Sequence, residues 1–149
     1  MYARRQTRRF PAVLVGVLTT FAVGCGSPAA PTPVMEIENF TGTLAVLGKD
    51  FKPFTVTYSA TASDASITVT AITAVDDQAA VATTIGVGFG EPAADGSCTR
   101  SATHSTNTAQ IGQELIATAA FGPGPYCVQI FDAGTLTESV NYAMTVRHF

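Results

Sequence analysis

The chain has 149 residues, of which 46% are hydrophobic and 13% charged, and its formal net charge is −3 at neutral pH. This length allows one domain of ordinary size, and a composition rich in Thr, Ala, Val and Gly without Trp is typical of a small β protein, not of a disordered tail. Beyond residue 24 the basic residues are Lys49, Lys52, Arg100 and Arg147, which against eleven acidic residues give −7. Such an acidic chain lacks the basic surface that a phosphate backbone requires, so we exclude nucleic-acid binding.

The first 24 residues have the three parts of an export signal. Four arginines within residues 1–9 precede an uncharged apolar run over residues 12–23, which ends in Ala22-Val23-Gly24-Cys25. The run is too short for a permanent anchor, because a membrane-spanning helix needs about 20 residues. The closing tetrapeptide resembles the bacterial lipobox, in which the lipoprotein signal peptidase cuts just before a lipid-modified cysteine. That resemblance implies that residues 1–24 are removed and that Cys25 carries the lipid; the alternative is an ordinary cleaved signal in which Cys25 is incidental.

Prolines and small residues from Gly26 to Pro33 cannot build a core and keep the chain extended, so residues 25–34 are expected to form a tether. In the proteobacterial sorting scheme that this sequence resembles, Gly26 after the cysteine, in place of Asp, favours the outer membrane over the inner membrane. Residues 35–149 remain as the folded domain.

Apolar residues recur at every second position through this domain, which predicts strands with one buried face. Residues 35–44 form the first predicted strand. The later strands are marked by Phe54, Val56 and Tyr58; Ile67, Val69 and Ala71; Ile85, Val87 and Phe89; Leu115, Ala117 and Ala119; Tyr126, Val128 and Ile130; and Val140, Tyr142, Met144 and Val146. We expect a single antiparallel β-sandwich of seven or eight strands, because one sheet alone would leave its apolar face in water.

Two stretches add detail to this prediction. Residues 97–111 are polar without clear periodicity, which predicts either a long loop or a poorly patterned edge strand. Gly86, Gly88 and Gly90 alternate along one face of a predicted strand, so we expect a neighbouring backbone or side chain to approach closely there.

Five segments carry a family resemblance: Asp50-Phe51, Phe54-Thr55-Val56, Ile67-Thr68-Val69-Thr70, the run from Gly124 to Ile130, and Tyr142-Ala143-Met144-Thr145-Val146. Together they resemble the bacterial pre-peptidase C-terminal domain over most of residues 40–146. The resemblance implies a compact β-sandwich that acts as an accessory, non-enzymatic module. Residues 82–89 depart from the acidic, leucine-rich strand common in that family, so no calcium site is carried over.

The titratable residues do not form a recognisable catalytic or metal motif. Ser101 and His104 are neighbours in a polar segment, which does not define a catalytic geometry, and His148 beside the C-terminus is expected to be solvated. The histidines and cysteines lack the spacing of a zinc site. Asp76-Asp77 and Asp95-Gly96 are predicted to form turns instead of calcium loops. We therefore expect no catalytic residue, no metal and no cofactor.

Cys98 and Cys127 are predicted to form a disulfide. The chain has three cysteines, of which Cys25 is assigned to lipid, and an exported protein meets an oxidising compartment that favours pairing of the other two. The bridge would hold the poorly patterned segment after residue 97. The alternative is two unpaired thiols, buried as small apolar groups.

These observations predict a lipid-anchored accessory protein of the cell envelope, with a non-catalytic binding or structural role. Its partners are then the membrane, through the N-terminal lipid, and an envelope protein or polysaccharide. One alternative is a carbohydrate-binding module, against which the absence of Trp counts, because Trp is the best platform for stacking sugars. The other alternative is a small envelope hydrolase.

Overall fold

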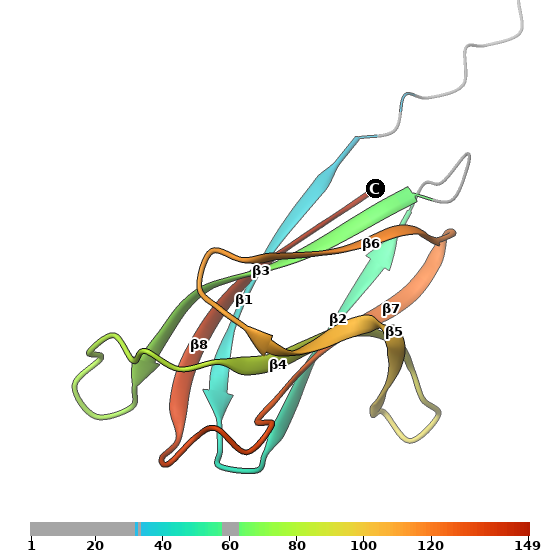
Figure 1. Cartoon of the computed structure of the whole chain (residues 1–149). Coiled ribbons are helices and arrows are strands. Elements are labelled where there is room, and N and C mark those ends of the chain that lie inside the picture. Colours follow the sequence, from blue (N-terminus) through green and yellow to red (C-terminus); the bar gives the residue numbers. More distant parts are fainter. Residues whose placement is uncertain (1–31, 33, 58–62) are drawn as a thin grey trace, which may run out of the picture. The chain divides into compact units, whose positions relative to one another are not determined.

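A computed structural model describes residues 32, 34–57 and 63–149 of the chain. Eight strands form in these residues: β1 (Glu36–Leu44), β2 (Lys49–Val56), β3 (Ser63–Ala74), β4 (Ile85–Pro92), β5 (Cys98–Ala109), β6 (Glu114–Phe121), β7 (Gly124–Phe131) and β8 (Val140–His148) (Figure 1). The export signal, Cys25 and Tyr58 lie outside the described residues. The described part contains no helix long and apolar enough to cross a membrane.

The strands form two four-stranded antiparallel sheets. The first sheet has the order β1-β8-β3-β6, and the second sheet has the order β2-β7-β4-β5. In the first sheet the beginning of β1 meets the end of β8, so that Glu36 pairs with His148 and Leu44 with Val140. The predicted all-β sandwich is therefore confirmed, with eight strands.

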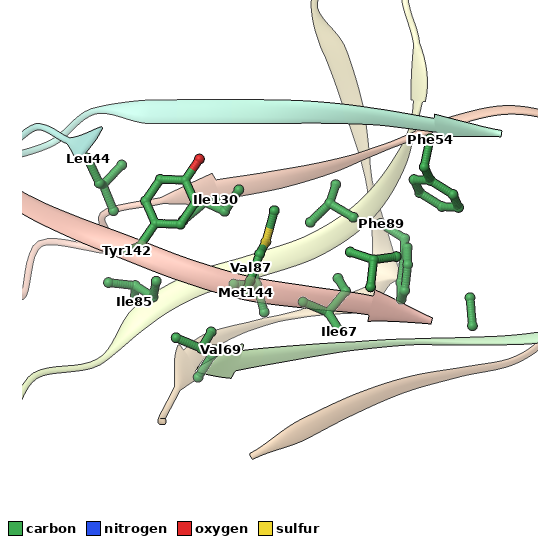
Figure 2. Close-up of a cluster of buried hydrophobic side chains, with 14 of the residues drawn as sticks. Leu44, Phe54, Ile67, Val69, Ile85, Val87, Phe89, Ile130, Tyr142 and Met144 are labelled. Carbon is green, nitrogen blue, oxygen red and sulfur yellow. The ribbon is translucent and has the colours of Figure 1, made fainter. Parts of the chain in front are cut away.

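The core lies between the two sheets and includes most of the residues that the alternation predicts to point inward. Figure 2 shows Phe54 and Phe89 at one end of this core and Leu44 and Tyr142 at the other. Each of these four side chains is at most 3% exposed. Burial of an apolar side chain of this size contributes about 1.5 to 3 kcal/mol, so the packed inner faces are the main source of stability.

The alternation fails at one point in β3. Val69 pairs with Met144 and Ala71 with Ala143, so Thr70 is an extra residue that forms a β-bulge. Beyond the bulge Ile72 points into the core, with an exposed fraction of 0%, and Ala71 does not. The prediction that Ala71 points inward is wrong, because a bulge shifts every later side chain of its strand to the opposite face.

The polar segment after residue 97 is an edge strand, which confirms one of the two predicted alternatives. β5 pairs with β4 alone, and its register is irregular. Arg100 pairs with Gly90 and Ser105 with Gly88, so residues 101–104 lie opposite Phe89 alone. This irregularity is the physical reason why the segment has no periodicity of two.

The expected close approach at the β4 glycines is also confirmed. A Cβ added to Gly86 would overlap the ring of Phe131, and one added to Gly90 would overlap the backbone oxygen of Thr99. The guanidinium carbon of Arg100 lies 3.9 Å from the centre of the Phe131 ring. The outer face of β4 is therefore covered by side chains and backbone from β5 and β7.

Candidate functional site

Cys98 and Cys127 form a disulfide, as predicted, with their Cα atoms 6.0 Å apart. The bond joins the beginning of β5 to β7, two strands that are separated by β4 in the second sheet. Strands separated by one intervening strand lie about 9.5 Å apart in a flat sheet. The beginning of β5 therefore leans over β4 toward β7, and Gly90 provides the space for it. The cross-link fixes the strand whose own pattern is weakest.

His104 lies in the irregular part of β5 and is half-buried. The centre of its ring is 6.5 Å from that of Phe121, beside a hollow of about 180 Å³ that Ser101 and Glu91 also line. The hydroxyl of Ser101 is hydrogen-bonded to the hydroxyl of Thr103 at 3.0 Å. Among the described residues no hydrogen bond joins Ser101 to His104, so the two neighbours in sequence do not form a nucleophile–base pair here.

His148 is buried, with an exposed fraction of 1%, and the prediction that it is solvated is wrong. It is the last residue of β8, and its ring packs 5.0 Å from that of Phe54 between the sheets. Its Nε2 atom lies 3.0 Å from Oε1 of Glu38 on β1. Its Nδ1 atom is buried and has no hydrogen-bond partner among the described residues.

A signal for this burial was present in the sequence. The inward alternation of Val140, Tyr142, Met144 and Val146 reaches His148 with one more step of two residues. Position beside a chain end indicates exposure only where no neighbouring strand covers that end, and here β1 does. The pairing of the first strand with the last could not be inferred from alternation, which gives the faces of strands but not their neighbours.

The outer face of the first sheet is mainly polar and uncharged over residues 39–43 of β1, residues 141–145 of β8 and the end of β3. We call it the threonine–asparagine face, and it consists of Asn39, Thr41 and Thr43 on β1, Asn141 and Thr145 on β8, and Thr73 on β3. Cross-strand hydrogen bonds of 2.8 Å join Thr43 to Asn141 and Thr145 to Asn39. A shallow hollow of about 460 Å³ lies over part of this face. The face thus presents ordered hydroxyl and amide groups to the solvent.

The outer faces of the two sheets differ. Phe131, Arg100 and the backbone of β5 cover the central strand β4 of the second sheet. On the first sheet, Thr41 and Thr43 are exposed, and Asn141 and Thr145 are partly exposed. The first sheet therefore presents an accessible polar surface over β1 and β8, whereas the central strand of the second sheet is covered.

Several aspartates hold turns, as the sequence predicts. Asp95 accepts a hydrogen bond from the backbone N–H of Ser97, and Asp77 accepts one from that of Ala79. Asp132 accepts four backbone N–H bonds, from Leu47, Gly134, Thr135 and Leu136. Burial acts to raise the pKa of Asp132, but these four donors outweigh it and lower the pKa to about 2.

No family model matches the chain, and no curated protein matches it either. The resemblance to the bacterial pre-peptidase C-terminal domain and to the lipobox therefore stays a prediction from the residues quoted above.

Proposed function

We propose that the chain is a lipid-anchored, non-catalytic binding or structural module of the cell envelope. Cys25 carries the lipid, with palmitate among its acyl chains, and residues 25–34 tether the domain to the membrane, the outer membrane in preference to the inner one. The Cys98–Cys127 disulfide supports export, because disulfides persist in oxidising compartments outside the cytoplasm.

The observation that carries the binding role is the accessible threonine–asparagine face. Ordered hydroxyl and amide groups without charge can donate and accept hydrogen bonds with a neutral partner. Thr43 and Asn141 illustrate this order, since each already holds the other in place at 2.8 Å. The partner is an envelope protein or a polysaccharide, and the domain itself supplies no chemistry.

Carbohydrate binding is the second candidate function. The threonine–asparagine face favours it, because sugar hydroxyls are neutral groups that both donate and accept hydrogen bonds. The hollow of about 460 Å³ beside Thr41 and Asn141 gives such a ligand a place on the face. Without Trp in the chain, hydrogen bonds would have to supply most of the recognition.

The anchor is tested by labelling and fractionation. We expect labelled palmitate to enter the wild-type protein and not Cys25→Ser, and we expect the variant to move to the soluble envelope fraction. Density-gradient separation of the membranes then assigns the wild type to the outer or the inner membrane. A wild-type protein that stays unlabelled and soluble would overturn the lipid anchor.

The binding face is tested by cross-linking in intact cells, followed by purification of the protein with whatever is attached. Thr41→Arg places a long charged side chain on the threonine–asparagine face and should reduce capture of the partner. Thr55→Arg, an exposed position on β2 of the second sheet, is the matched control and should capture as the wild type does. Equal capture by both variants would place the partner elsewhere.

The non-catalytic role has a separate test. His104→Ala removes the half-buried histidine of β5, and we expect the cellular function that depends on this protein to continue unchanged. Loss of that function in a variant that is still folded and still exported would favour the envelope hydrolase instead.

A further inference from the structure

Glu36, Glu38 and His148 converge at the end of the sandwich where β1 begins and β8 ends. Glu36 is paired with His148 across the two strands, and Glu38 lies two residues along β1 on the same face. One ligand atom of each side chain lies within 4.8 Å of those of the other two. One of these contacts is the 3.0 Å approach of His148 Nε2 to Glu38 Oε1.

The charges in this cluster are not balanced by a basic side chain. Among the described residues, neither glutamate forms an ion pair with a lysine or an arginine, whereas Lys52 pairs with Asp50 elsewhere in the fold. Glu36 has a weak hydrogen bond from the hydroxyl of Thr57, at 3.4 Å. Two carboxylates that face one imidazole repel each other, and a bound cation would remove this repulsion.

The imidazole of His148 is held by packing within the core, unlike that of a histidine in a solvated ion pair. The side chain of His148 has an exposed fraction of 0%, and its ring packs against Phe54. Its Nδ1 atom has no partner among the described residues, which costs free energy for a buried polar atom. The packing leaves Nε2 beside Glu38, and the side chains of both glutamates reach solvent.

We propose that Glu36, Glu38 and His148 form a binding site for a first-row divalent metal ion of the zinc type. Imidazole nitrogen is a preferred ligand of Zn²⁺ and its neighbours in the series, whereas Ca²⁺ and Mg²⁺ take oxygen ligands. Two atoms that bind one Zn²⁺ at about 2.1 Å lie at most about 4.2 Å apart. The contact between His148 and Glu38 meets this limit, and a small rotation of the exposed Glu36 side chain brings in the third ligand.

A metal ion at this site would cross-link the beginning of β1 to the end of β8. β1 is one of the two edge strands of the first sheet, and its first residue would share an ion with the last residue of β8. Because the ion binds the folded chain in preference to the unfolded one, its binding raises the stability of the fold. The site does not depend on the lipid anchor or on the threonine–asparagine face, so it can be tested apart from the proposed function.

The test is calorimetric titration of the full chain, purified in detergent and freed of metals, with ZnCl₂. We expect one Zn²⁺ per chain, and we expect Glu38→Gln, Glu36→Gln and His148→Gln each to weaken binding by at least about 10-fold. The control is His104→Gln, which removes the other histidine of the chain and should leave the affinity unchanged. A second control, Glu138→Gln, removes an exposed glutamate outside the strands.

Thermal melting supplies a second readout, since His148 is part of the core. At the same concentration, Zn²⁺ should raise the melting temperature of the wild type and of both controls more than that of Glu36→Gln or Glu38→Gln, whose side chains reach solvent. Absence of Zn²⁺ binding, undiminished affinity in Glu38→Gln, or an equal loss in His104→Gln would each overturn the proposal. Binding of Ca²⁺ as tight as that of Zn²⁺ would also overturn it, because the imidazole would then not be a ligand.

Discussion

The hydroxyl of Tyr142, on β8 in the first sheet, donates a hydrogen bond of 2.6 Å to Oδ2 of Asp50, on β2 in the second sheet. Lys52 Nζ lies 3.1 Å from the same oxygen. Gly42 on β1 makes room for the contact, since a Cβ there would lie 2.6 Å from the Tyr142 hydroxyl. This hydrogen bond joins the two sheets at the edge where β1 faces β2.

Tyr142→Phe should therefore destabilise the domain by about 1 to 2 kcal/mol, because the carboxylate loses a buried charge-assisted partner while Lys52 remains. Burial and the bond to Asp50 raise the pKa of Tyr142 above its ordinary value of 10.0. The wild type should thus lose stability as the pH rises past 10, and the variant should lose less. Urea unfolding measures both effects, and Tyr126→Phe is the control on the half-buried tyrosine of β7. Equal stability of the wild type and Tyr142→Phe would contradict this role.

Gly86→Ala should cost about 1 to 3 kcal/mol, because the new methyl group would meet the Phe131 ring that lies against β4. Gly122→Ala is the matched control, since a Cβ there meets nothing within 4 Å. Combining Gly86→Ala with Phe131→Ala should relieve the clash, so the two changes should be non-additive in a double-mutant cycle. Additive losses would show that the Phe131 ring is not what excludes a larger residue at position 86.

Replacement of both Cys98 and Cys127 by alanine should lower the free energy of unfolding by about 3 to 4 kcal/mol, on the chain-entropy estimate for a sequence separation of 29. Reduction of the wild type should produce the same loss, and the double variant should not respond to reductant. Peptide mapping by mass spectrometry without reductant should find the linked pair. Two free thiols at these positions in the oxidised protein would refute the bridge.

Asp132→Asn should destabilise the domain by about 1 to 3 kcal/mol. The amide keeps one oxygen, but its NH₂ group replaces an oxygen that accepts a backbone N–H bond. The lowered pKa also sets an acid limit: the stability that Asp132 contributes is present above pH 4 and is lost as the pH falls from about 4 toward 2.

Unfolding at pH 7 and at pH 3 checks both statements about Asp132. The difference between the wild type and Asp132→Asn should be smaller at pH 3. Asp76→Asn, in an exposed turn, should change stability little at either pH. A difference that stays constant between the two values would mean that Asp132 does not titrate as proposed.

The strands could be predicted from the sequence because each inward face has a period of two, and Val140 to Val146 is the clearest example. The alternation carries no information on a bulge such as Thr70, since threonine suits either face of a sheet. For β5 the sequence predicted either a loop or an edge strand, because residues 101–104 depart from regular pairing and leave no clear alternation.

Of the site residues, the two cysteines could be predicted from the sequence, whereas the cluster of two glutamates and a histidine could not. The pairing of Cys98 with Cys127 follows from the number of cysteines and the expected compartment. The meeting of Glu36, Glu38 and His148 depends on which strands are neighbours, and residues separated by about the whole length of the domain give no local signal of that contact. Only the burial of His148 could be read from the sequence, as the last step of the β8 alternation.

The N-terminal segment continues into β1 at Glu36, the residue that is paired with His148. Any mechanical load carried along that segment therefore acts first on this pair and only then on the next pairs of the β1–β8 ladder. A force that peels β1 from β8 opens this ladder one pair at a time, and the first pair is then the one that resists it first. An ion held by Glu36, Glu38 and His148 would bear the force at the one place where it enters the fold.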